Sequence, residues 1–316
     1  MTQTQTYGRT DAVTAPTAKP EPDRGRRTLA LMLTALGLGL LSAPLLGPLV
    51  LGVMEYRTSP TTLHQLLGSD AAALLVVAPL CFLAALLVAH GRFAGPPLAA
   101  GIGGYAVYTY FQVVVGQEYL RLPGNVERFF PLLLTIFILA GAALVLAWGQ
   151  LAEDLPRPSR RLERLAGWVL LLLSAFLVLG LHLRSMLTAW TDPRLLTEYA
   201  SAPTPFWLVK LMDLGVVVPV AIATGVGLLR GVSWARRVLY PLLTGYALLS
   251  VSVSAMAVVM LARDDPDSSV TLAAGFGLFT LSLLALAFAL YRPLFLQTRD
   301  ASWSSTTGNG PAELGR

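Results

Sequence analysis

Eight long apolar segments, separated by short polar ones, run along the chain. They cover residues 28–54, 71–90, 97–116, 129–148, 166–183, 208–229, 238–262 and 270–291. A helix of about 20 apolar residues crosses the hydrocarbon core of a bilayer, and proline and glycine are tolerated inside such helices. The pattern therefore predicts an all-α, polytopic membrane helix bundle with eight transmembrane helices.

Polar segments flank and divide this apolar pattern. Residues 1–27 are rich in proline and threonine and end in DRGRR, so they are too long and too polar for a signal peptide. We expect a disordered cytoplasmic tail there and a second cytoplasmic tail at 298–316. Residues 149–165 are expected to form a cytoplasmic linker.

Composition supports a membrane protein. The chain is 55% hydrophobic and only 13% charged, with a mean hydropathy of +0.64, whereas soluble domains carry about 25% charged residues. Its single cysteine, Cys81, excludes a disulfide within the chain.

The basic residues predict an orientation. With the N-terminus inside, the inner segments hold 16 of the 23 lysines and arginines, in agreement with the positive-inside rule. We therefore expect a multi-pass membrane protein with both termini cytoplasmic. The inner arginine clusters then face anionic headgroups of the lipid bilayer, and no nucleic-acid partner is expected.

The two halves of the chain share ordered landmarks. These are LSA at 41–43 and 173–175, TSP at 58–60 and TDP at 191–193, Asp70 and Asp213, and GYA at 104–106 and 245–247. Their common order predicts two four-helix repeats, 28–148 and 166–297, in the same orientation. Chance similarity between helices rich in leucine and alanine is the alternative.

Lys210 and Asp213 lie three residues apart near the predicted start of the sixth helix. Asp213 is expected at the outer edge of the hydrocarbon, where an aspartate in the first turn complements the helix dipole and a lysine opposes it. Lys210 therefore either extends outward to the headgroups or pairs with an acid, and Asp213 shares its helix face. The alternative is a purely structural anchor and cap at the membrane interface.

Two polar stripes follow helical spacing. Tyr105, Tyr108, Gln112 and Tyr119 fall near one face of the third predicted helix, and Tyr246, Ser250 and Ser254 near one face of the seventh. The stripes line a cavity or form hydrogen bonds between helices. The candidate residues of an outward-facing polar pocket are Asp213, Lys210, Asp70, Tyr105, Tyr108, Gln112, Glu118, His182, Tyr246 and Ser250. Asp264, Asp265 and Asp267 are expected in a solvated turn.

Catalytic signatures are missing from the sequence. There is no HExxH, GxSxG, P-loop or zinc-like Cys/His spacing, so no catalytic residue, metal or cofactor is expected. A transporter-like bundle that carries a small molecule fits best, and a membrane protein that binds, senses or scaffolds is the alternative. An intramembrane enzyme acting on lipid head groups would need Asp70, Asp213, Glu118 or His182 to converge. A small molecule or a lipid is thus the expected ligand, and the oligomeric state stays open.

Three segments carry a resemblance. DLGVVVP (213–219), GLLRGVSW (227–234) and NVERFFPLLLTIFIL (125–139) resemble segments of uncharacterised bacterial multi-span membrane proteins. The resemblance covers about a fifth of the chain and implies a polytopic protein of the bacterial inner membrane. It implies no activity and no role for any residue.

Overall fold

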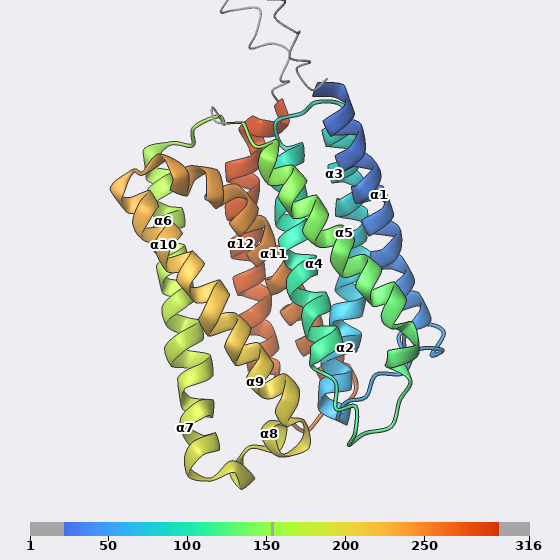
Figure 1. Ribbon diagram of the computed structural model, residues 1–316. Helices are drawn as coiled ribbons and strands as arrows, with labels where there is room; N and C mark the ends of the chain where they lie inside the picture. Colours follow the sequence, from blue (N-terminus) through green and yellow to red (C-terminus); the bar gives the residue numbers. More distant parts are fainter. Residues whose placement is uncertain (1–21, 153–154, 297–316) are drawn as a thin grey trace, which may run out of the picture.

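A computed structural model describes residues 22–152 and 155–296 (Figure 1). The described chain is all-helical, with 82% helix and no strands. Eight of its helical segments are long and apolar enough to cross a membrane. The predicted fold class, a helical membrane protein with eight spans, is confirmed.

The eight segments are referred to as spans 1 to 8. Span 1 is α1 (Pro22–Leu46). Span 2 consists of α2 (Pro60–Ala72), η1 (Ala73–Val77) and α3 (Ala78–Ala89). Span 3 is α4 (Gly95–Val115), and span 4 consists of η2 (Val126–Phe129) and α5 (Phe130–Gly149). Span 5 consists of α6 (Arg160–Ala175), η3 (Phe176–His182) and α7 (Leu183–Thr191). Span 6 consists of α9 (Pro203–Met212), η5 (Asp213–Val217) and α10 (Val218–Arg230). Span 7 is α11 (Ser233–Ala262), and span 8 is α12 (Val270–Leu296). The short elements η4 (Pro193–Leu195) and α8 (Thr197–Ser201) connect spans 5 and 6.

The bundle has two distinct ends. The first described helix begins and the last one ends at the same end, which we call the terminal end (Figure 1, top). The opposite end, called the loop end, carries the connections 47–59, 116–125, 192–202 and 263–269. The predicted tails 1–21 and 298–316 lie outside the described residues. Residues 22–27, expected in the first tail, form the start of α1.

Several span boundaries differ from the prediction. Span 1 ends at Leu46 rather than at 54, because a turn follows it. Spans 2 and 6 begin at Pro60 and Pro203, well before the predicted 71 and 208. Proline at the first helical position is pre-organised for a helix start. Hydropathy alone does not detect these two starts, because each lies before the long apolar run of its span. The consequence is that Asp70 and Asp213 lie inside their spans rather than at the start.

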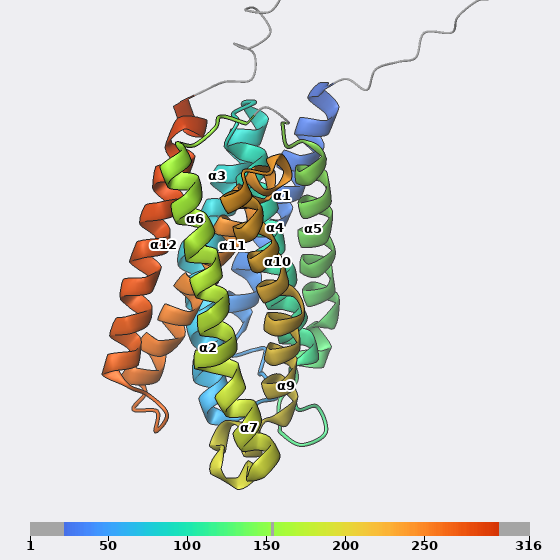
Figure 2. The same cartoon turned by 90° about the vertical axis from the view of Figure 1, so that its left-hand side faces the viewer.

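The centre of the bundle is formed by α4 and α11 (Figures 1 and 2). On one side, α1 and α4 both pack against α3 and α5. On the other side, α10 packs against α6 and α11, and α11 against α12. The two sides meet where α11 packs against α2 and α4, and where α4 packs against α9.

Glycines allow the closest of these contacts. A Cβ added at Gly68 of α2 would lie 2.3 Å from the Cα of Met256 in α11, and one added at Gly101 of α4 would lie 2.3 Å from the Cβ of Thr244. Small residues at such positions let membrane helices approach to backbone contact. The halves of the bundle are therefore packed directly, backbone against backbone.

Three spans contain a π-helical segment: η1, η3 and η5. In two of them a proline, Pro79 or Pro219, follows as the second residue of the next α-helix. Proline cannot donate a backbone hydrogen bond, and its ring crowds the carbonyl four residues earlier, so a widened turn relieves the clash. No proline explains η3, and π-helical turns often occur at functional sites.

Candidate functional site

Asp213 is the centre of a buried polar cluster drawn from three spans. Its Oδ1 accepts a hydrogen bond of 2.6 Å from the hydroxyl of Tyr108 in span 3. Its Oδ2 lies 2.8 Å from Nε2 of His182 in span 5. Asp213 is only 8% exposed and His182 only 2% exposed. A carboxylate and an imidazole from different helices thus form one buried pair.

The pair lies within the bundle and not at its edge. Asp213 is the first residue of η5, and His182 is the last residue of η3. Ten residues, about 15 Å of helix, separate Asp213 from Pro203 at the start of the span. Asp213 therefore cannot serve as a first-turn residue that complements the helix dipole, and this expectation was wrong. The span has 28 residues, so Asp213 lies about 5 Å from its midpoint along the axis.

Span 7 adds a further wall to the cluster. The hydroxyl of Tyr246 donates a 2.6 Å hydrogen bond to the backbone carbonyl of Val217, the last residue of η5. The π-helical segment that begins at Asp213 is thus held by a side chain from the neighbouring span 7. Spans 3, 5, 6 and 7 all contribute a polar group here.

Lys210 lies one helical turn from Asp213, toward the loop end. It is 6% exposed, so it does not extend outward to solvent. Its Nζ lies 3.3 Å from the ring centroid of Phe206 and 3.5 Å from the Phe206 carbonyl oxygen. No carboxylate oxygen of the described residues lies within 4.0 Å of this ammonium group, although Asp213 and Glu198 are close enough to interact electrostatically. Lys210 is therefore buried without a direct ion pair.

Gln112 lies one turn from Tyr108 on α4. Its Nε2 is buried, close to the Tyr108 hydroxyl but not in hydrogen-bond geometry with it or with any other described acceptor. A buried amide without an acceptor is unusual in a folded protein. The cluster therefore contains one donor that the protein itself does not satisfy.

Asp70 belongs to a different cluster. It accepts a 2.9 Å hydrogen bond from Tyr56, in the loop between spans 1 and 2, and is near Tyr110. The hydroxyl of Tyr105 pairs with Ser252 of α11 at 2.6 Å. Neither Asp70 nor Tyr105 hydrogen-bonds to Asp213, so the third predicted helix sends its tyrosines to two separate places.

Glu118 and Ser250, two other candidate pocket residues, make local structural bonds. Glu118 accepts a 2.8 Å hydrogen bond from the backbone N–H of Thr204, in the first turn of α9, and lies 3.6 Å from Arg121. A carboxylate at a helix N-terminus stabilises it, which explains how α9 begins without a capping side chain of its own. Ser250 donates to the carbonyl of Ala247 in its own helix.

The loop end holds one correction to the sequence analysis. Asp265, expected to be solvated, is only 4% exposed. Its Oδ2 lies 2.7 Å from Nδ1 of His64 in α2, and its Oδ1 accepts hydrogen bonds from Thr61 and the backbone of Asp267. Burial alone would raise the pKa of Asp265, but these hydrogen bonds together lower it below its ordinary value. No local signal marks this contact, since His64 is 201 residues away in the sequence.

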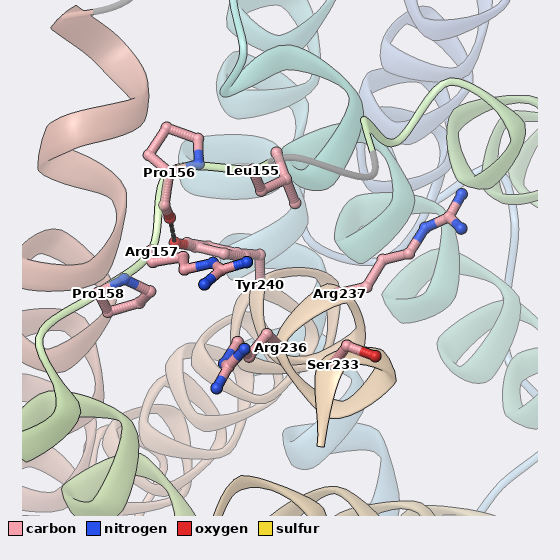
Figure 3. Close-up of a pocket in the computed structure, with 8 residues that line it drawn as sticks. All are labelled: Leu155, Pro156, Arg157, Pro158, Ser233, Arg236, Arg237 and Tyr240. Carbon is pink, nitrogen blue, oxygen red and sulfur yellow. Dashed lines mark hydrogen bonds between the residues drawn. The ribbon is translucent and has the colours of Figure 1, made fainter. Parts of the chain in front are cut away.

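A small cavity lies at the terminal end, between the linker and the first turns of α11 (Figure 3). It has a volume of about 60 Å³ and is lined by Leu155, Pro156, Arg157, Pro158, Ser233, Arg236, Arg237 and Tyr240. Two of the guanidinium groups have partners: Arg236 lies 2.7 Å from Glu163, and Arg237 donates to carbonyls of Trp148 and Leu151. This cavity is at the opposite end from the expected polar pocket and contains none of its candidate residues.

No protein-family model, no curated protein and no solved structure matches this chain. The class of protein that the fold defines is an integral membrane protein with eight spans. Among the described residues, no group of three or more His, Cys, Asp or Glu side chains could hold a metal ion.

Proposed function

We propose that this membrane protein is a carrier for a small polar molecule, and that the Asp213–His182 pair binds and releases the proton that drives it. One observation carries the proposal: a carboxylate and an imidazole from two spans meet 2.8 Å apart in the buried interior. Ionisable groups within membrane spans are costly, and they commonly mark ion pathways and proton relays.

The chemistry of the pair suits proton exchange. Histidine is the side chain whose ordinary titration range includes physiological pH, and a carboxylate beside it shares the proton. The other polar and charged groups near the pair are Tyr108, Tyr246 and Lys210, and Lys210 in turn interacts with Glu198. Gain or loss of one proton changes the bonds between spans 5 and 6, and both spans contain a π-helical turn at that level.

The internal duplication predicted from the sequence would suit a carrier architecture, and the following features favour it. The π-helical segments of spans 2 and 6 begin at Ala73 and Asp213, and the positive-φ glycines that end these spans are Gly91 and Gly231. Both pairs are 140 apart in residue number. The packing of span 1 on 2, 2 on 3 and 3 on 4 recurs as 5 on 6, 6 on 7 and 7 on 8. Two repeats related by an axis along the bundle, between α4 and α11, are a known carrier design.

The alternatives are less well supported. An intramembrane enzyme would need several acidic and basic groups around one reacting atom, and although Asp213 and His182 meet, Asp70 and Glu118 are engaged elsewhere. A sensor or scaffold has no need for a buried donor without an acceptor, such as Gln112.

We also propose the bacterial inner membrane as the location, with the terminal end in the cytoplasm; reporter fusions at both termini test that orientation.

The test is solute-driven proton movement. The purified full chain is reconstituted into liposomes that contain a pH-sensitive dye, and amines, sugars, amino acids and monocarboxylates are added in turn. We expect one class to move protons with the wild type and with Asp70→Asn, which removes a different buried carboxylate within a span. Asp213→Asn should abolish the signal. A folded wild type that moves no protons with any class, or an Asp213→Asn variant as active as the wild type, would overturn the proposal.

A further inference from the structure

Two buried hydrogen-bond donors beside the proton site are incompletely satisfied by the described residues: Lys210 donates only a long bond of 3.5 Å to a carbonyl of its own helix, and Gln112 has no acceptor. The ammonium group of Lys210 has no carboxylate partner within 4.0 Å among the described residues and rests against the Phe206 ring. The side-chain amide of Gln112 has a buried Nε2 without an acceptor. Both groups donate, and the lysine is a cation when protonated.

These two residues lie at the same level of neighbouring helices. Span 3 runs toward the loop end and span 6 runs away from it, so they are antiparallel. Tyr108 meets Asp213 at one level, and one end of α4, at Gly116, approaches Leu208 at another, where an added Cβ would lie 3.4 Å from Leu208 Cδ2. Along span 3, Gln112 is midway between Tyr108 and Gly116, and along span 6, Lys210 is about midway between Leu208 and Asp213. The register therefore brings the two donors toward each other, one turn closer to the loop end than Asp213.

Burial of an unpaired ammonium group is strongly unfavourable, much more so than burial of an ion pair. The aromatic ring of Phe206 offsets part of this cost, because the face of the ring attracts a cation. The remaining deficit is one negative charge and one or more hydrogen-bond acceptors. A carboxylate supplies both, and its two oxygens can accept from two donors at once.

We infer that the transported molecule carries an anionic group, a carboxylate, which binds between Lys210 and Gln112. This inference rests on the proposed carrier function and names its substrate class. The bound carboxylate lies about one helical turn from Asp213, and two negative charges at that separation repel. Binding of the anion therefore favours protonation of the Asp213–His182 pair. Anion and proton move together, and for a monocarboxylate the pair of charges sums to zero.

Binding is measured apart from transport, by thermal unfolding of the full chain in mild detergent. The probes are sodium lactate and sodium benzoate, each compared with its neutral amide at the same ionic strength. We expect both carboxylates to raise the unfolding temperature and the amides to leave it unchanged. Lys210→Met and Gln112→Leu should weaken carboxylate binding, the former at least about 30-fold. The matched control Arg194→Met removes an exposed cation at the loop end and should bind like the wild type.

The outcomes separate this inference from the proposed function. If neutral solutes move protons in the liposome assay and Lys210→Met moves them as well as the wild type, the anion site is wrong and the carrier stands. If carboxylates bind through Lys210 but move no protons, the anion site stands and the proton-driven carrier fails. Equal stabilisation by carboxylates of the wild type and of Lys210→Met and Gln112→Leu would also overturn the anion site.

Discussion

The buried pair of His182 and Asp213 allows a sharp thermodynamic test. His182→Leu removes the imidazole, keeps a similar volume and leaves the Asp213 carboxylate buried with Tyr108 as its remaining hydrogen-bond donor among the described residues. At 2.8 Å, two unit charges attract by about 6 kcal/mol at an effective dielectric constant near 20. Desolvation cancels part of that attraction, and loss of one partner of a buried pair typically costs about 3–5 kcal/mol.

The decisive variant is the double substitution. Asp213→Asn alone should cost about 1–2 kcal/mol, because the amide still hydrogen-bonds to Tyr108 and to the ring of His182. When Asp213→Asn is added to His182→Leu, the stranded charge disappears, so the double variant should be more stable than His182→Leu alone. The expected coupling energy is about 3 kcal/mol, well above the roughly 0.5 kcal/mol within which independent sites add.

The assay is unfolding of the purified protein in mild detergent by titration with sodium dodecyl sulfate, followed by tryptophan fluorescence. Each of the four proteins is titrated at the same pH, and the free energies of unfolding are compared as a cycle. If the costs of the two single substitutions simply add in the double variant, the carboxylate and the imidazole do not interact as argued. The buried pair would then not exist in the folded protein.

Three further predictions concern packing, capping and pH. Gly68→Ala should lower the free energy of unfolding by about 1–3 kcal/mol, because the new methyl group would lie 2.3 Å from the backbone of α11. In the control Gly104→Ala the new methyl group meets nothing within 4 Å, so this variant should be neutral or stabilising in the same unfolding assay. Glu118→Gln should cost about 1–2 kcal/mol, because the N-terminus of α9 loses a buried anionic cap; an unchanged midpoint would contradict that role. The pKa of Asp265 is lowered by folding, so its bonds stabilise the protein above about pH 4 and this stability is lost as the pH falls through the folded pKa. Asp265→Asn should therefore flatten the acid limb of the stability profile measured from pH 7 to pH 3, and a profile parallel to that of the wild type would exclude the effect.

The sequence predicted the number of spans because hydrophobic length is a local property. It also identified Tyr108, His182 and Asp213 as polar residues worth attention. It did not reveal their meeting, since the contact depends on how spans 3 and 5 each pack against span 6, and no local pattern encodes that packing. The depth of Asp213 was misjudged for a related reason. The start of span 6 is stabilised by a proline and by a carboxylate from another loop, at Glu118, and hydropathy cannot register either contribution.

The proposed duplication also changes which residues correspond between the halves. The landmark analysis matched Asp70 with Asp213, but the π-helical segments put Ala73 opposite Asp213, and the prolines and the terminal glycines agree with the same offset. On this register Asp70 corresponds to Lys210, one turn away. The first half thus has a carboxylate, hydrogen-bonded to Tyr56, where the second half has a buried ammonium group with no carboxylate oxygen of the described residues within 4.0 Å. If the proposed duplication and carrier function hold, the second half is the one that offers both the proposed anion site and the proposed proton site among the described residues, so each transport cycle would carry one anion and one proton rather than two of each.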